Sequence, residues 1–226
     1  MDHHETLDGA RVLVTGAGGG LGAPLVEGLL RAGARVVVSS RTPREVPGTR
    51  AVAADLRLPG EPERLVEEAV AHLGGLDGLV HAAGVVAFGP ATEADDDLLD
   101  ELFLADAIGP IRLLRAAVPH LRAGRDPFAV VVSAVVAERP QPGMAAYSAA
   151  KAALSAFVRA LAREERFRVL DVRPPHTETG LATRPVAGTA PRLPAGLAPR
   201  EVAERVLRAV TGGERELGAA AFTRPV

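Results

Sequence analysis

RVLVTGAGGGLG, residues 11–22, runs from a β-branched apolar segment directly into a cluster of glycines. Residues 11–16 are typical of a buried strand, and residues 20–32 have the apolar spacing of a helix. A glycine turn at that junction lets the backbone approach a phosphate, and the helix N-terminus supplies free N–H groups. A tight turn without any ligand would have the same composition, because loops collect glycine for steric reasons. The stretch therefore predicts a βα unit, with a dinucleotide-binding turn as the leading hypothesis.

The alternation of Val-rich runs and helical patterns continues along the whole chain. Continuous apolar strands separated by helices indicate a parallel sheet covered on both faces. We therefore expect an α/β fold in which residues 1–226 form a single doubly wound, Rossmann-type domain. Further strands are predicted at 35–41, 50–56, 76–84, 128–134 and 167–174, with an edge strand near Phe222. Further helices are predicted at 62–73, 97–121 and 145–166, with a last one after residue 199.

Composition excludes several classes of function. A net charge of −2 favours neither a nucleic-acid nor an anionic-membrane partner. No cysteine is present, and His72, His81 and His120 are scattered, so no metal site is expected. The first nine residues, MDHHETLDG, lack the features of a signal peptide, and no apolar run reaches membrane-spanning length. These observations predict a cytoplasmic protein.

The segment from about residue 176 to 197 is rich in Pro, Gly and Thr and is long for a loop in a compact α/β domain. It follows the sixth predicted strand, and ligands of such sheets lie beyond the carboxyl ends of the strands. We interpret the segment as a candidate lid over a small-molecule substrate; partial disorder is the alternative.

Tyr147 and Lys151 are the only tyrosine and the only lysine in the chain, and they lie four residues apart. On a helix this spacing places both side chains on one face. A phenol is a poor base at neutral pH, but a nearby ammonium favours its ionised form, so the pair could transfer a proton. The alternative is an incidental pair on a solvated helix.

The motif T-G-x-x-x-G-x-G, together with Y-x-x-x-K, resembles the short-chain dehydrogenase/reductase family, and the resemblance covers nearly the whole chain. It implies that Tyr147 is the acid/base, and that Lys151 holds the nicotinamide ribose and lowers the pKa of the phenol. Asp55-Leu56 matches the adenine contact, and His81-Ala82-Ala83-Gly84 replaces the family's N-N-A-G. The implied cofactor-binding residues are Thr15, Gly16, Gly20, Leu21, Gly22, Ser40, Arg41, Asp55, Leu56, Ala82, Ala83, Gly84, Tyr147, Lys151, Pro174, Thr177 and Thr179.

The second predicted strand ends Ser39-Ser40-Arg41, without the acidic residue that usually holds the ribose of a cofactor lacking a 2′-phosphate. A guanidinium clamps a phosphate, and the family's NADP-preferring members carry an arginine after this strand. We therefore expect NADP(H) to be preferred over NAD(H). A solvated surface arginine is the alternative.

Two further positions depart from the family. Its carbonyl-binding serine corresponds to Ala134, and Ser133 could replace it only if the strand ends or bulges there. The family's asparagine corresponds to Asp106, which could accept from a relay water but would also stabilise Lys151 as a cation and oppose a phenolate. His176 could be an extra acid or base, although a loop turn capped by hydroxyls is the simpler interpretation.

The leading functional hypothesis is an NADP(H)-dependent oxidoreductase that interconverts a carbonyl and an alcohol on a small or mid-sized organic substrate. Ala134 and Asp106 keep two alternatives open. One is a catalytically degenerate nucleotide-binding or regulatory protein, and the other is a lyase, cyclase or isomerase that uses Tyr147. The family resemblance also implies a homodimer or homotetramer assembled through the helices at 97–121 and 145–166.

Overall fold

A single parallel sheet forms the centre of the computed structural model, which describes residues 7–42 and 46–222. Its strand order is β3-β2-β1-β4-β5-β6-β7. The prediction of a doubly wound, Rossmann-type sheet is confirmed. Residues 1–6, on which the signal-peptide prediction partly rests, lie outside the described residues. The strands are β1 (Arg11–Thr15), β2 (Arg35–Ser40), β3 (Thr49–Ala53), β4 (Gly78–His81), β5 (Phe128–Val132), β6 (Arg168–Val172) and β7 (Glu216–Leu217).

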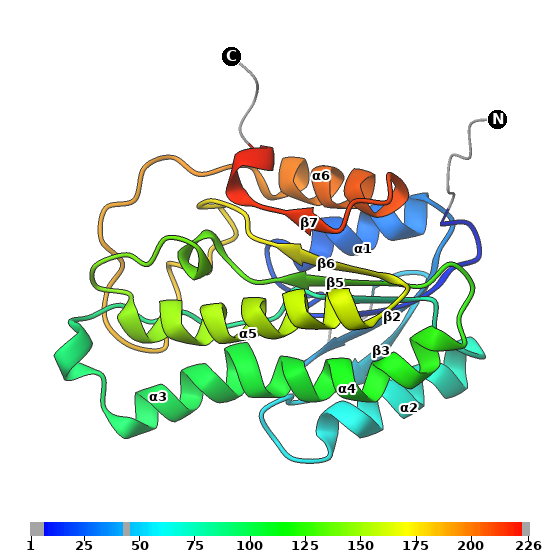
Figure 1. The fold of residues 1–226 in the computed structure, drawn as a ribbon, viewed down its shortest axis with the longest axis horizontal. Helices are drawn as coiled ribbons and strands as arrows, with labels where there is room; N and C mark the ends of the chain where they lie inside the picture. Colours follow the sequence, from blue (N-terminus) through cyan, green and yellow to red (C-terminus); the bar gives the residue numbers. More distant parts are fainter. Residues whose placement is uncertain (1–6, 43–45, 223–226) are drawn as a thin grey trace.

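Helices cover both faces of this sheet (Figure 1). On one face lie α1 (Gly22–Arg31) and α6 (Pro199–Thr211); on the other lie α2 (Glu61–Leu73), α4 (Gly109–Arg122) and α5 (Ala145–Glu164). Alternate strand residues point to opposite faces, so the two helical layers enclose two separate apolar clusters. A third cluster packs around Tyr147. No helix in the described ranges combines the length and hydropathy needed to cross a bilayer.

The long helix predicted at 97–121 is divided in two. The helix α3 (Asp96–Phe103) leads into a π-helical turn (Leu104–Ile108), which is followed by α4. Pro110 has no N–H to donate to the carbonyl of Asp106, and Gly109 instead donates to Leu104, five residues back. The extra residue in the turn bulges the helix at Asp106.

The edge strand predicted near Phe222 is wrong. Strand β7 is Glu216–Leu217, and Ala219–Phe222 forms a 3-10 turn. A polar network fixes β7 to the sheet. Asp171 of β6 accepts hydrogen bonds of 2.6 Å from the hydroxyls of both Ser133 and Ser155. Arg173 forms ion pairs with Asp171 and with Glu216 in β7, so its buried guanidinium connects neighbouring strands.

The two ends of the segment at 176–197 are bonded to each other, and the segment is bonded near its tip to the stretch that follows β4. Thr177 bridges to Leu197 at the base, where Leu197 N–H donates to the carbonyl of His176 at 2.9 Å. Near the tip, Val186 N–H donates to the carbonyl of Val86 at 2.8 Å. The segment, called the strap below, therefore crosses the carboxyl edge of the sheet and is held there by backbone hydrogen bonds. Its role as a lid stays a prediction.

Candidate active site

The glycine turn after β1 packs closely against the segment that follows β4. Gly16 has a φ of 76°, and a Cβ there would lie 2.5 Å from the backbone nitrogen of Ala83. A Cβ on Gly22 would lie 2.0 Å from the carbonyl oxygen of Gly16. Both positions require glycine, because no side chain fits into these spaces. The turn and the 82–84 segment thus form one continuous backbone surface at the carboxyl edge of the sheet.

The same turn meets the strap. A Cβ on Gly20 would lie 2.3 Å from the carbonyl oxygen of Thr179, so the two backbones touch at this point. Among the described residues, the N–H groups of Gly20 and Leu21 donate no backbone hydrogen bond, and α1 begins without a side-chain cap. Free N–H groups at a helix N-terminus suit an anion such as a pyrophosphate. The turn therefore fits the nucleotide that its sequence predicts.

The residues predicted around the adenosine lie beyond β2 and β3. Ser40 ends β2, and the Arg41 side chain that follows it is exposed. Asp55 forms an ion pair with Arg57 at 2.6 Å, and Arg57 forms a second with Glu101 at 2.6 Å. Hydrogen bonds from Arg57 chiefly lower the pKa of Asp55, and the charge of Arg41 lowers it slightly further. The carboxylate predicted to contact adenine is thus already engaged, while the exposed side chain of Arg41 forms no ion pair with another described residue.

Tyr147 and Lys151 both lie on the buried face of α5, with Lys151 Nζ 5.9 Å from the centre of the phenol ring. Lys151 is not directed only at the tyrosine, because its Nζ lies 3.0 Å from Oδ1 of Asp106. The side chains of this ion pair are 4% and 0% exposed. The same Oδ1 accepts the N–H of Val85 at 3.1 Å. Asp106 therefore holds the only ammonium side chain of the chain in a buried contact.

Gly84 completes the wall of this site. A Cβ there would lie 2.5 Å from Asp106 Oδ1 and 3.0 Å from Lys151 Nζ. The ion pair can approach the turn after β4 only because this position has no side chain.

The resemblance implies that Lys151 lowers the pKa of Tyr147; on balance, however, the pKa of Tyr147 is raised in this structure. Burial raises the pKa of Tyr147 strongly, and the negative charge of Asp106 raises it further. A buried phenolate would lack solvent, and the ammonium that could stabilise it is paired with a carboxylate. The phenol is therefore the stable form of this group.

The two residues near the family's serine position point to different surroundings. Strand β5 ends at Val132, and Ser133 turns into the interior, where its hydroxyl bonds to Asp171. Ala134 instead packs against the apolar cluster that contains Tyr147. Ser133 is thus committed to a structural bond, and Ala134, which packs against the cluster that includes Tyr147, has no hydroxyl.

His81 at the end of β4 is fully buried, and its Nδ1 lies 2.8 Å from the hydroxyl of Thr15. Its Nε2 has no hydrogen-bond partner among the described residues. Burial, assisted by the positive charge of Lys151, lowers the pKa of His81 to about 3. The ring is therefore a neutral, structural link between β1 and β4.

The segment after β6 agrees with the simpler interpretation of a hydroxyl-capped turn. Thr177 donates its hydroxyl to the carbonyl of Pro175 at 2.9 Å, and Leu181 N–H donates to the hydroxyl of Thr179 at 3.3 Å. His176 Nε2 lies 3.4 Å from a carboxylate oxygen of Glu178 within the same segment. Pro174 accepts the N–H of Val135, which ties this segment to the stretch after β5.

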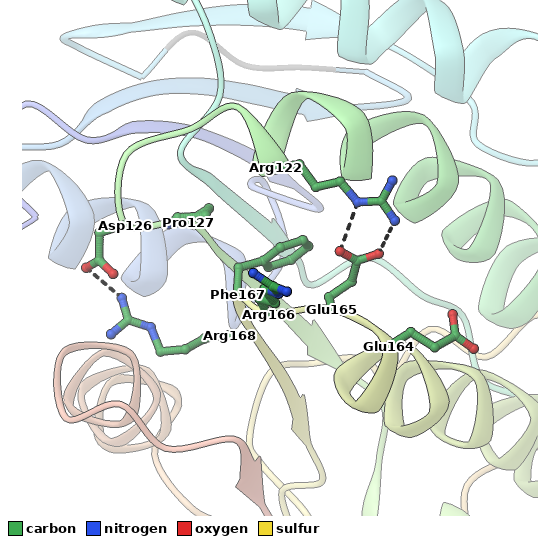
Figure 2. Close-up of a pocket in the computed structure, with 8 residues that line it drawn as sticks. All are labelled: Arg122, Asp126, Pro127, Glu164, Glu165, Arg166, Phe167 and Arg168. Atoms are coloured by element: carbon green, nitrogen blue, oxygen red, sulfur yellow. Dashed lines mark hydrogen bonds and ion pairs between the residues drawn. The ribbon is translucent and has the colours of Figure 1, made fainter.

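A concavity of about 540 Å³ lies at the opposite edge of the sheet, where β5 and β6 begin (Figure 2). Its charges are largely paired within the wall. Arg122 bonds to Glu165 and Arg168 bonds to Asp126, at 2.5 Å and 2.8 Å. It is lined by Arg122, Asp126, Pro127, Glu164, Glu165, Arg166, Phe167 and Arg168, none of which belongs to the predicted site.

Comparison with known proteins decides the family. The family model described as short chain dehydrogenase matches residues 10–188. The chain belongs to this family. The chain is 37% identical over 171 residues to a short chain dehydrogenase of Emericella nidulans, covering 70% of its own length and 64% of the relative's. It is 35% identical over 168 residues to a versicolorin reductase of the same organism, covering 69% and 63%. The chain thus spans less than two thirds of the length of these relatives.

Solved structures of the family agree with the fold. A 3-ketoacyl-(acyl-carrier-protein) reductase from Brucella melitensis, complexed with NADH, has a TM-score of 0.84 and 25% identity over 97% of this chain and 100% of its own. A short chain dehydrogenase from Burkholderia cenocepacia, in complex with NADP, has a TM-score of 0.83 and 26% identity over the same shares. In both of these neighbours the same fold binds a nicotinamide nucleotide.

Proposed function

We propose that this chain is a nicotinamide-dependent oxidoreductase that interconverts a carbonyl and an alcohol on a small or mid-sized organic substrate. One observation carries the proposal: the only phenol of the chain lies buried beside its only ammonium, at the sheet edge that bears the glycine turn. Reductases among the relatives support it. Loss of NADPH absorbance with a panel of carbonyl compounds tests it directly.

When bound, the nicotinamide would supply or accept the hydride. Gly20 and Leu21 would hold its pyrophosphate through free N–H groups, and Lys151 and the segment from Pro174 would flank its ribose and ring. Tyr147 would give a proton to the carbonyl oxygen, or take one from the alcohol. The apolar cluster around the phenol, which includes Ala134, would exclude water from the reacting group.

NADP(H) is the preferred cofactor in this proposal, and Arg41 is the group that distinguishes it from NAD(H). Its exposed guanidinium follows β2 and lies near enough to affect Asp55, so it can reach a 2′-phosphate beside the adenosine ribose. Arg41→Ala should weaken NADPH binding by about tenfold or more and leave NADH binding nearly unchanged. Fluorescence titration with both nucleotides measures this, and Arg50→Ala in β3 is the matched control. Equal losses for both nucleotides would exclude Arg41 as the selector.

Ala134 should limit the rate, because it offers no hydrogen bond to the reacting carbonyl. A single polarising donor contributes on the order of 3 kcal/mol to lowering the barrier. Ala134→Ser should therefore raise kcat by about a hundredfold, with a smaller change in KM. Steady-state kinetics on the best carbonyl substrate measures it, and Ala137→Ser in the following turn provides the control. An unchanged or lower kcat would mean that the site does not use a donor at this position.

The missing donor also favours a second candidate function. Without a hydroxyl facing Tyr147, the chain could bind the nucleotide without turnover, or use the phenol in a lyase, cyclase or isomerase reaction. Tight NADPH binding with no turnover on the carbonyl panel would support the binding function. Product formed without net change in the nucleotide would support the non-redox enzyme.

Assembly and location stay predictions from the sequence. The predicted homodimer or homotetramer would use helices that correspond to α3, α4 and α5. Small exposed side chains on α5, such as Ala149, Ala156 and Ala160, would allow a second copy to pack closely. A cytoplasmic location would suit a chain that draws on the cellular pool of NADPH.

A further inference from the structure

We propose that Asp106 is a positioning residue that captures Lys151 and thereby keeps Tyr147 a neutral phenol, so that the site works in the direction of carbonyl reduction. The proposal rests on the proposed function only for the reaction direction. A neutral phenol can give a proton to a carbonyl oxygen, whereas taking a proton from an alcohol requires the phenolate form.

The capture of Lys151 follows from the geometry of the buried pair. Asp106 Oδ1 lies 3.0 Å from Lys151 Nζ and also accepts the N–H of Val85, so the carboxylate is fixed from two directions. The π-helical turn carries Asp106 inward, and Gly84 leaves the space that the pair occupies. An ammonium held 5.9 Å from the ring centre and neutralised by a carboxylate provides little net field for a phenolate.

The charged groups of the surrounding elements do not replace this lost field. His81 on β4 is neutral, because burial lowers its pKa to about 3. Glu101 on α3 adds another negative charge near Asp106, although Arg57 pairs with it. On balance the pKa of Asp106 is raised, chiefly by burial and slightly by the charge of Glu101, while Lys151 and the N–H of Val85 oppose the rise. Burial and the negative charge of Asp106 are thus the two causes that set the pKa of Tyr147, and both raise it.

The composition of the chain provides a direct measurement of this state. Tyr147 is the only tyrosine, and there is no tryptophan, so the near-ultraviolet absorbance of phenolate reports this one group in the intact protein. An alkaline titration needs neither cofactor nor substrate. Circular dichroism at each pH shows whether the fold persists.

In the folded wild type we expect no phenolate at or below about pH 10, the ordinary pKa of a tyrosine. If the protein unfolds first, phenolate should appear only after the helices are lost. Asp106→Asn removes the negative charge and frees Lys151, so its phenolate should appear about one pH unit or more lower, in the folded protein. Asp77→Asn is the matched control, because Asp77 is another buried carboxylate, at the far end of β4. Its titration should follow the wild type.

Three results would overturn the proposal: phenolate in the folded wild type near pH 10 or below, coincident titrations of wild type and Asp106→Asn, or an equal shift in Asp77→Asn. If Asp106→Asn folds poorly, Asp106→Ser gives the same comparison with a smaller acceptor. Failure of every carbonyl to be reduced would remove the proposed function but leave these titrations unchanged, so the two failures are distinguishable.

Discussion

Replacing Tyr147 with phenylalanine should lower kcat by about 10²- to 10⁴-fold, the usual contribution of a positioned proton donor. The change deletes one hydroxyl and keeps the ring that packs against the apolar cluster containing Ala134. No other tyrosine or lysine beyond Lys151 is available to take over the proton transfer. Nucleotide binding should persist, because the glycine turn does not depend on the phenol.

Single-turnover and steady-state rates of NADPH consumption measure this effect, with nucleotide binding measured in parallel. Ser148→Ala is the matched control: it removes a hydroxyl from the adjacent buried residue of α5, and that hydroxyl has no partner among the described residues. Its kcat should equal that of the wild type. A Tyr147→Phe protein with wild-type turnover would mean that the proton comes from another group.

Acidification should destabilise the fold sharply because of His81. Its pKa is about 3 in the folded chain and 6.5 as an ordinary histidine, so below pH 6.5 the unfolded chain binds a proton that the folded chain excludes. The contribution of the neutral His81 ring to stability is therefore fully present above pH 6.5 and is lost as the pH falls toward 3. The loss from this one ring is on the order of 3 kcal/mol by about pH 4.

Urea unfolding at neutral pH and at about pH 4 tests this, by comparing the wild type with His81→Asn. Asparagine can donate or accept a hydrogen bond with Thr15 but takes up no proton. The acid-induced loss of stability should therefore be smaller in the variant by about 3 kcal/mol. His72→Asn is the control, because His72 on α2 remains in contact with water. Parallel losses in the wild type and His81→Asn would show that His81 does not cause the acid sensitivity.

Much of the fold follows from local sequence patterns. Runs such as residues 35–41 and 128–134 contain buried β-branched residues on both faces, and this pattern placed their strands to within two residues. Strand β7 could not be found in this way, because two residues carry no periodicity. Its place depends on Arg173, which is distant from it in sequence. The π-helical turn was also missed, although Gly109-Pro110 was a local sign that a regular helix would be interrupted.

The candidate site was predictable where residue type and spacing suffice. The four-residue interval placed Tyr147 and Lys151 on one buried face, and the charge at position 106 already suggested opposition to a phenolate. The sequence could not show that burial would outweigh the ammonium, since burial depends on how separate elements pack. The bond from Ser133 to Asp171 was equally hidden, because it joins residues 38 positions apart.

The short strand β7 has a consequence for behaviour at high concentration. Exposed strand edges are templates for pairing with other molecules, and proteins protect them with short strands and charges. Here β7 is two residues long, contributes the charged Glu216, and is fastened over the end of β6 by the guanidinium of Arg173. The short length of β7, the charge of Glu216 and the ion pair with Arg173 should together limit intermolecular β-pairing at this edge, and so limit aggregation at high concentration.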